Sequence, residues 1–421
     1  MGVAEVLNAY KMNFAPFVRP YYSEPLVVDR AEGVHMWDLA GRRYLDGYAA
    51  VATTSFGHCN RQINDAVKTQ MDKYGHISYI YESELIANYS NRLLEKCGKY
   101  YSKLFFVNSG SEAVDLAVMI ARIFCDSETV FTFSEGYHGG TFLSKFATGL
   151  DTWHPKVQRD ENIVYITTPE CFNCAEHCND KEHAVCIEGA RDKFEQINAK
   201  GKRPILLLEP VLGVGGILTP PVHYFKYLAE MIEEYNVLLI CDEVQTGFGR
   251  CGSYYFGFQK FGIQPYIICM GKAIANGYPL GAVVFADSIA HSLKDMLHFN
   301  TFGGNPISIA AANEVLNILE KSDILENVEE TGKYFFEKLK KDLEGVSSIV
   351  EIRGVGLFIG IEFETSEKAH EVLNDCRKEG FLAGIGGRRR NVLRIQPALT
   401  FSKENCDEAA AIIKRVLIEA E

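Results

Sequence analysis

No stretch of this 421-residue chain approaches the roughly 20 consecutive apolar residues that a bilayer-spanning helix needs. The N-terminus, MGVAEVLNAYKMNF, also lacks the basic start and the apolar stretch of a secretory signal. Glu5 and the scarcity of basic residues argue against a transit peptide, and Val6 stands where a myristoylation site needs Ser or Thr. We therefore predict a cytoplasmic protein without membrane contact, with the mitochondrial matrix as the alternative because a processed form would have the same features.

Basic residues are too few to balance the acidic ones. Lys and Arg together number 43, Asp and Glu number 55, and the formal net charge is −12. Because an acidic chain repels phosphate backbones, we expect no general nucleic-acid binding. Hydrophobic residues make up 47% and charged residues 23%, which excludes disordered and collagen-like chains and leaves a globular protein of two or three domains.

Twelve cysteines are present, but without a secretory signal we expect reduced thiols rather than disulfides. Four of them follow the spacing Cys171-x2-Cys174-x3-Cys178-x7-Cys186. Thiolates so spaced can bind zinc, but the spacing is not that of a standard zinc ribbon and no second pair follows. We interpret the segment as a cysteine-rich surface insertion and predict no metal site, with structural zinc as the alternative.

Apolar segments alternate with helical ones in the middle of the chain. Continuous apolar strands alternating with helices predict an α/β fold with a mainly parallel sheet flanked by helices. In such sheets, ligands bind beyond the carboxyl ends of the strands. The predicted strands, some ending in turns, lie within 104–110, 129–140, 203–211, 237–247 and 265–277, and the predicted helices cover 111–124 and 221–235.

The pattern changes from about residue 310, where helical segments precede the strand-like IVEIRGVGLFIGIEF and VLRIQPALTF. This order of elements is typical of a smaller α+β domain. We predict an N-terminal segment over 1–60 that joins the small domain, a large domain over 61–308, and the C-terminal small α+β domain over 309–421.

Polar residues cluster where the predicted strands end. Ser109, Gly110 and Ser111 lie between a strand and a helix, where small residues and free helix N–H groups suit a phosphate; an ordinary Ser N-cap is the alternative. Asp242 follows a very apolar strand and needs a partner, either a helix cap, a salt bridge or a protonated heterocyclic nitrogen. Lys272 also follows an apolar strand, where desolvation would lower its pKa; a surface lysine is the alternative.

Two glycine-rich turns add further candidates. Tyr137 and His138 lie in EGYHGG, where the tyrosine could stack on a flat ligand ring or pack at the sheet edge. His138 is counted with Tyr137 among the cofactor-binding candidates and is interpreted as a turn residue rather than a base. The second turn, NTFGGNP, contains Thr301 and is rich in hydrogen-bonding groups.

In this order, NSGSEA, EGYHGGT, CDEVQTGFGR, MGKAIANGYPLGAV, NTFGGNP and LRIQPAL resemble the motifs of class III aminotransferases, which are pyridoxal 5'-phosphate enzymes of fold type I. The likeness runs from about residue 45 to 399 and is closest to the alanine–glyoxylate aminotransferase 2-like and other omega-amino-acid branches. It implies transfer of an amino group from a small-molecule donor to a 2-oxo acid such as pyruvate, glyoxylate or 2-oxoglutarate. It also implies a homodimer with shared active sites.

The resemblance assigns the chemistry to Lys272 and Asp242. Lys272 would form a Schiff base with the cofactor and then move the proton between substrate and cofactor. Asp242 would keep the pyridine nitrogen protonated, so that the ring acts as an electron sink. Gln245 would bond the ring oxygen, and Val244 and Tyr137 would cover the two ring faces.

The resemblance also assigns the binding of phosphate and substrate. Gly110 and Ser111 would hold the phosphate beside Ser109, and Thr301 would reach the phosphate of the neighbouring subunit. Arg394 would grip the substrate α-carboxylate, and Glu209 would lie near the substrate pocket and pair with an arginine when no side-chain carboxylate is bound.

Other functions on the same scaffold stay open. Leu212, Tyr266 and Cys59-Asn60 depart from the common family pattern, which leaves the substrate unassigned. The scaffold also serves decarboxylases, racemases and phospho-lyases. A nicotinamide dehydrogenase is disfavoured, because neither Gly213-Val-Gly215-Gly216 nor Gly354-Val-Gly356 has the third glycine of a dinucleotide-binding turn.

Overall fold

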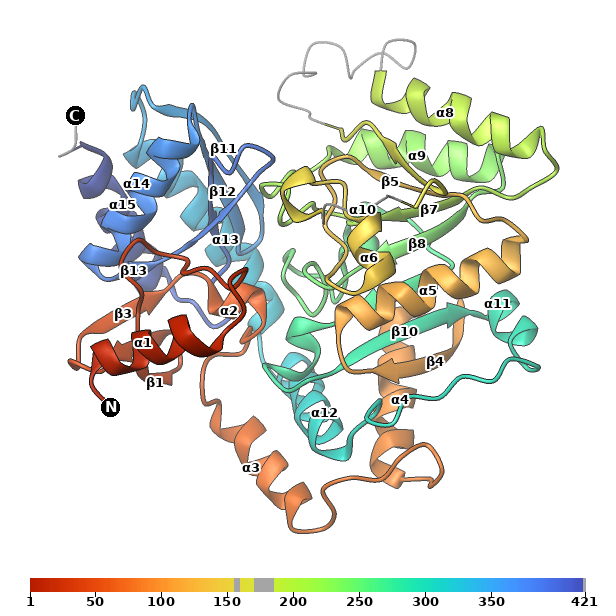
Figure 1. Ribbon diagram of the computed structural model, residues 1–421, viewed down its shortest axis with the longest axis horizontal. Helices are drawn as coiled ribbons and strands as arrows, with labels where there is room; N and C mark the ends of the chain where they lie inside the picture. The colour runs from red at the N-terminus through yellow and green to blue at the C-terminus, as the bar shows by residue number, and fades with distance from the viewer. Residues whose placement is uncertain (155–159, 170–184, 419–421) are drawn as a thin grey trace.

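The computed structural model describes residues 1–154, 160–169 and 185–418 (Figure 1). Cys171, Cys174 and Cys178 of the predicted cysteine cluster lie outside these ranges, so the prediction about that cluster is not tested. Within the same ranges, no helix is long and apolar enough to cross a membrane. Nor do three or more His, Cys, Asp or Glu side chains of these ranges gather in a way that could hold a metal ion.

Seven strands form the central sheet in the order β4-β10-β9-β8-β7-β5-β6 (Figure 1). Five neighbouring strands, from β9 to β6, run parallel, whereas β10 is antiparallel to both β4 and β9. The predicted α/β class with a mainly parallel sheet is confirmed. The strands are β4 (Tyr101–Val107), β5 (Val130–Phe133), β6 (Ile163–Ile166), β7 (Ile205–Leu208), β8 (Leu238–Asp242), β9 (Ile267–Met270) and β10 (Gly281–Ala286).

Strands β7 and β9 are apolar at every position, as expected where helices cover both faces of the sheet. In β7, Leu206 and Leu208 join one apolar core, and Ile205 and Leu207 join the other. A strand buried on one face only would alternate polar and apolar residues. The helices around the sheet are α3 (Arg61–Met71), α4 (Glu84–Cys97), α5 (Gly110–Cys125), α6 (Phe142–Ala147), α8 (Val185–Asn198), α9 (Val222–Glu234), α10 (Gly257–Phe261), α11 (Asp287–Ser292) and α12 (Pro306–Lys321).

Two smaller sheets lie beside the central one (Figure 1). One is antiparallel, with the order β11-β12-β15-β14, and β14 is its edge strand. The other has the order β1-β2-β3-β13, so it joins an N-terminal hairpin to a strand from the C-terminal part of the chain. The strands are β1 (Val28–Glu32), β2 (His35–Asp38), β3 (Arg43–Asp46), β11 (Ile349–Val355), β12 (Phe358–Phe363), β13 (Phe381–Leu382), β14 (Gly384–Gly386) and β15 (Val392–Ile395).

Helices α13 (Ile324–Asp342), α14 (Ser366–Glu379) and α15 (Lys403–Ile418) pack around these sheets, and α1 (Val3–Asn13) lies near them (Figure 1). Helix α12 begins at Pro306, with the Asn305 side chain accepting from Ile307 N, and packs against α3 and α4. The domain limits predicted at 60 and 308 stay predictions.

Arg250 ties the loop after β8 to the smaller sheets. Its side chain is only 1% exposed. Nη1 donates to the carbonyl oxygens of Leu357, at 2.9 Å, and Pro397, at 2.6 Å, and Nη2 donates to Ser55 Oγ at 3.0 Å. These acceptors come from three separate segments, so one buried guanidinium joins the central sheet to both ends of the chain.

Replacing Arg250 with Met should destabilise the fold by about 2–4 kcal/mol, because two buried carbonyl groups lose their donor. The measurement is the unfolding temperature by scanning calorimetry. Arg61→Met is the control, because Arg61 lies on the surface of α3 with a side chain 94% exposed. Equal unfolding temperatures for the Arg250 and Arg61 variants would contradict the assigned role.

Candidate active site

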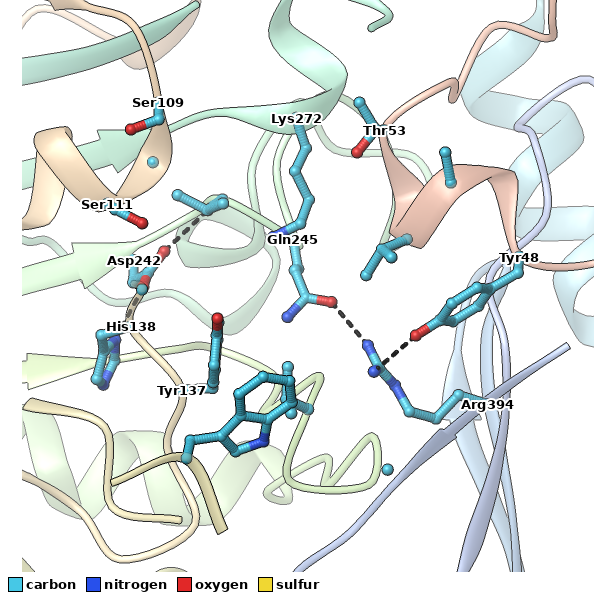
Figure 2. Close-up of a pocket in the computed structure, with 18 of the residues that line it drawn as sticks. Tyr48, Thr53, Ser109, Ser111, Tyr137, His138, Asp242, Gln245, Lys272 and Arg394 are labelled. Atoms are coloured by element: carbon cyan, nitrogen blue, oxygen red, sulfur yellow. Dashed lines mark hydrogen bonds and ion pairs between the residues drawn. The ribbon is translucent and has the colours of Figure 1, made fainter. Parts of the chain in front are cut away.

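A cavity of about 970 Å³ opens beyond the carboxyl ends of the central strands. It is bounded by the start of α5 and the ends of β8 and β9 on one side, and by β14, β15 and the N-terminal segment on the other (Figure 2). The site residues predicted from sequence that line it are Ser109, Gly110, Ser111, Tyr137, His138, Glu209, Asp242, Val244, Gln245, Lys272 and Arg394.

The start of α5 forms a cradle for an anion. Ser109 is the N-cap, and its Oγ accepts from Glu112 N at 3.2 Å. Ser111 Oγ accepts from Gly140 N at 3.0 Å. Among the described residues each hydroxyl is used only as an acceptor, so its proton is available for a ligand. The first N–H groups of a helix have no partner within it, so Gly110 and Ser111 add backbone donors.

Among the described residues, Asp242 is held by an imidazole and a backbone N–H and not by a lysine or an arginine. Its Oδ2 lies 2.8 Å from His138 Nδ1, and its Oδ1 accepts from Val244 N at 3.0 Å. His138 Nε2 in turn lies 2.9 Å from Thr132 Oγ1, which orients the imidazole. Within the described ranges, Asp242 forms no ion pair with Lys or Arg, so its buried carboxylate can still take a cationic partner.

Lys272 follows β9 at the start of the 3-10 helix η2 (Lys272–Ala275), with its backbone in the left-handed region at φ +46°. Burial lowers the pKa of the Lys272 amine to about 8, although the nearby Asp242 and Glu209 carboxylates act in the opposite direction. A neutral amine is a nucleophile and a base, so the site can supply one close to neutral pH.

Tyr137 and Val244 both line the cavity, and the part of the cavity between them is a slot for a ligand. Trp153 packs edge-on against Tyr137, with ring centroids 5.1 Å apart. Val244 packs against Gly110, where a Cβ would come within 2.6 Å of Val244 Cγ2. Only glycine at that position lets the start of α5 come this close to the slot. The slot suits a flat ring.

Glu209 lines the cavity but forms no ion pair within the described residues. Its Oε1 accepts from Tyr137 N at 2.8 Å, and its Oε2 accepts from Gly213 N at 3.1 Å. Burial raises the pKa of the Glu209 carboxyl to about 7. No arginine of the described residues forms an ion pair with Glu209, and each of its oxygens can still accept from a further donor. The arginine pairing expected for Glu209 stays a prediction.

Arg394 extends from β15 into the cavity and is 2% exposed. Nη1 donates to the Tyr48 hydroxyl and Nη2 to Gln245 Oε1, both at 3.0 Å (Figure 2). The Gln245 amide oxygen is thus used, and its NH₂ group is left as a donor toward the cavity. No carboxylate of the described residues lies within ion-pair distance of Arg394, so the guanidinium can bind an anionic ligand.

The sequence analysis missed the cavity wall built by α2 (Ala49–Ala52), which contributes Ala50 and Val51. All four α2 residues have left-handed φ values, from 45° to 63°. Asp46 Oδ1 accepts from Tyr48 N and from the first N–H of α2. Asp46 Oδ2 lies 2.7 Å from His58 Nε2. The sequence carries no recognisable signal for this left-handed turn other than Asp46, which lies two residues before Tyr48.

Thr301 is exposed and does not line the cavity of its own chain. Its predicted contact requires a second subunit, so it stays a prediction. The remaining groups fit pyridoxal 5'-phosphate: an anion cradle, a slot for a ring, a buried carboxylate and an amine of lowered pKa.

Comparisons with known proteins agree with this geometry. A family model described as aminotransferase class-III matches residues 18–417. The chain is 29% identical over 447 residues to human alanine–glyoxylate aminotransferase 2, mitochondrial, covering 100% of this chain and 87% of the relative. It is 33% identical over 437 residues to a leucine/methionine racemase from Thermococcus litoralis, covering 100% and 97%.

A solved structure of a Bacillus anthracis aminotransferase has the same fold, with a TM-score of 0.93, 27% identity and coverage of 100% of both chains. The implied fold type I architecture is thereby confirmed. The chain belongs to the class-III aminotransferase family, whose enzymes depend on pyridoxal 5'-phosphate.

Proposed function

We propose that this protein transfers an amino group from an amino acid or omega-amino donor to a 2-oxo acid such as pyruvate, glyoxylate or 2-oxoglutarate. One observation carries the proposal: the Lys272 amine, with its lowered pKa, opens into the same cavity as the buried Asp242 carboxylate and the Arg394 guanidinium. A nucleophile, a partner for a pyridinium and a site for a carboxylate are the three groups that the reaction needs.

Different residues around the cavity would bind different parts of the cofactor. The start of α5, with Ser109, Gly110 and Ser111, would hold the phosphate. Asp242 would bond the pyridine nitrogen, since no Lys or Arg of the described residues pairs with it and its ion-pair contact there is with His138. When bound, the cofactor supplies an aldehyde and a ring that accepts the electrons released at the substrate carbon.

The remaining contacts would fix the plane of the ring. Tyr137 and Val244 would cover its two faces, and the Gln245 NH₂ group would donate to the ring oxygen. His138 supports the site through Asp242, because its two ring nitrogens contact Asp242 and Thr132.

Lys272 would bind the cofactor covalently in the resting enzyme and, once displaced by the amino donor, would act as the base. Its neutral amine would take the proton from the substrate carbon that carries nitrogen and deliver it to the carbon on the other side of that nitrogen, two bonds away. Arg394 would hold the substrate carboxylate and so set the orientation of that carbon.

A homodimer belongs to this proposal. Exposed apolar side chains gather where two loops meet, since the Phe302 and His76 rings lie 5.2 Å apart at this point. Ile80, Tyr81 and Leu297 are exposed on the same loops. Exposed apolar patches are typical of protein interfaces. A two-fold arrangement would let Thr301 reach the neighbouring phosphate. For the location, we keep the cytoplasm, with the mitochondrial matrix as the alternative because the human relative is named mitochondrial.

Racemisation is the second candidate function, favoured by the leucine/methionine racemase that covers the whole chain. A racemase also removes and returns the α-proton but leaves the nitrogen on the substrate. The two functions therefore differ in whether nitrogen reaches a second carbonyl compound.

The first test is an absorbance titration of the purified protein with amino donors. We expect a visible band from the Lys272-bound cofactor that bleaches with an amino donor and returns with a 2-oxo acid. Lys272→Ala should abolish turnover by at least about 10⁴-fold, because it removes both the nucleophile and the base. A band that no donor bleaches would argue against transamination, and racemised product would indicate the second function.

The second test concerns the proton on Lys272. In cofactor-free protein, acetylation of Lys272 should rise with pH with a midpoint of about 8 instead of 10.5, because only the neutral amine reacts and burial lowers its pKa. Mass spectrometry measures the labelled fraction, with an unstructured lysine peptide as the reference. A midpoint near that of the peptide would show that Lys272 is not desolvated.

A further inference from the structure

We propose that Tyr48 and Tyr21 are positioning residues that hold Arg394 ready for the carboxylate of the substrate. The inference rests on the proposed function only in assigning that carboxylate to an amino donor or a 2-oxo acid. Neither tyrosine belongs to a motif with an assigned role. Figure 2 shows the Tyr48 hydroxyl pointing at the guanidinium, opposite Gln245.

The hydrogen bonds run in one direction. A guanidinium has only donors, so the Tyr48 oxygen accepts from Arg394 Nη1 at 3.0 Å. The Tyr48 and Tyr21 oxygens are 3.2 Å apart. The Tyr21 hydroxyl donates to the Ile385 carbonyl oxygen at 3.0 Å and accepts from Ile385 N at 2.6 Å. Since Tyr21 uses its single proton on Ile385, Tyr48 must donate the proton that lies between the two tyrosines.

The far end of this chain is fixed by backbone. Ile385 is the middle residue of β14, the edge strand of its sheet. The outward N–H and C=O groups of an edge strand have no neighbouring strand to pair with. The Tyr21 hydroxyl satisfies both groups of Ile385, which anchors the hydroxyl more firmly than a bond to a flexible side chain would.

The two glycines of β14 leave room for this arrangement. A Cβ on Gly384 would overlap the ring of Tyr48, and a Cβ on Gly386 would overlap Cδ of Arg394. Glycines at alternate positions of a strand face the same side. The two glycines therefore give β14 a flat surface against which the Tyr48 and Arg394 side chains lie.

The acceptors of the Arg394 guanidinium are the neutral groups of Tyr48 and Gln245, and their effect differs from that of a carboxylate partner. Burial raises the pKa of the Tyr48 phenol, so its hydroxyl stays neutral. Tyr48 and Gln245 orient the guanidinium without cancelling its charge, which remains available to the substrate. Tyr48 also gives no proton to the substrate, because its hydroxyl already donates its proton to the Tyr21 oxygen.

The test compares ligands that differ by one group: β-alanine, propylamine without the carboxylate, and propionate without the amine. In Tyr48→Phe, we expect propionate binding to the cofactor-loaded protein, measured by calorimetry, to weaken about tenfold. The KM for β-alanine should rise by a similar factor with little change in kcat, and propylamine should be unaffected. Tyr22→Phe is the matched control, because the Tyr22 hydroxyl donates to Ala383 O, outside the chain of bonds.

A double-mutant cycle tests the direction of the chain. Tyr21→Phe alone should weaken propionate binding about threefold, since Tyr48 loses its acceptor but still accepts from Arg394. In the Tyr48→Phe background, the same change should cause no further loss, because its connection to Arg394 is already cut. Additive effects would overturn the chain.

The propionate measurement is independent of the proposed reaction. If the protein transfers no amino group but binds propionate in a manner that Arg394→Met abolishes and Tyr48→Phe weakens, the proposed function fails and this inference stands. Propionate binding that is absent from the wild type, or unchanged in Arg394→Met or in Tyr48→Phe, overturns it.

Discussion

The cavity contains buried charged side chains that are bonded to groups other than an oppositely charged Lys, Arg, Asp or Glu, and the rest of the site depends on this arrangement. Asp242 and Arg394 are both almost fully buried, and neither forms an ion pair with a basic or acidic side chain of the described residues, apart from the contact of Asp242 with His138. Burial of an unsatisfied charge is costly, so each must be compensated in another way. An imidazole and a backbone N–H surround Asp242, a phenol and an amide surround Arg394, and Lys272 lowers its pKa.

Compensation by hydrogen bonds, without a Lys, Arg, Asp or Glu partner among the described residues, leaves the charges usable. An internal salt bridge would have to be broken before a pyridinium or a carboxylate could bind, and breaking it would expose an unpaired buried charge. Hydrogen bonds to His138 or Tyr48 need not be broken, since a carboxylate or guanidinium has further sites for a ligand. The site is thus ordered in advance without its own residues competing with the ligands.

Hydrogen bonds from the surrounding residues also explain why the strained left-handed turn at α2 persists. Left-handed backbone costs about 1–2 kcal/mol for each non-glycine residue. Such strain survives only where the surroundings over-determine it. Asp46 bonds the start of the turn, and Asn276, just after η2, bonds both Phe56 N and Gly57 O beyond its end. The segment that carries Lys272 therefore holds in place the wall that faces it.

Features that depend on interactions between residues close in the sequence could be predicted, whereas features that depend on contacts between distant residues could not. The central sheet was predictable because apolar strands and helical periodicity are local signals. The predicted residues at strand ends line one cavity because parallel strands end at the same edge. The antiparallel β10 left no local signal that separates it from its neighbours. The contacts of Tyr21 and Tyr48 depend on β14, more than 300 residues away, and no periodicity reports such a pairing.

The charges around the cavity also bear on the kind of donor. In a chain of net charge −12, a basic cavity must be built from residues brought together by the fold. A positive potential attracts anions and raises their local concentration. Covalent attachment of the cofactor would use one cation and its phosphate would offset about two more, so what remains for a substrate is the Arg394 guanidinium, which has no acidic partner among the described residues. A donor or acceptor with a carboxylate is therefore better matched to this cavity than a simple amine. Among the described residues that line it, the basic ones are Arg19, Lys145, Lys272, Arg390 and Arg394, and the acidic ones are Glu209 and Asp242.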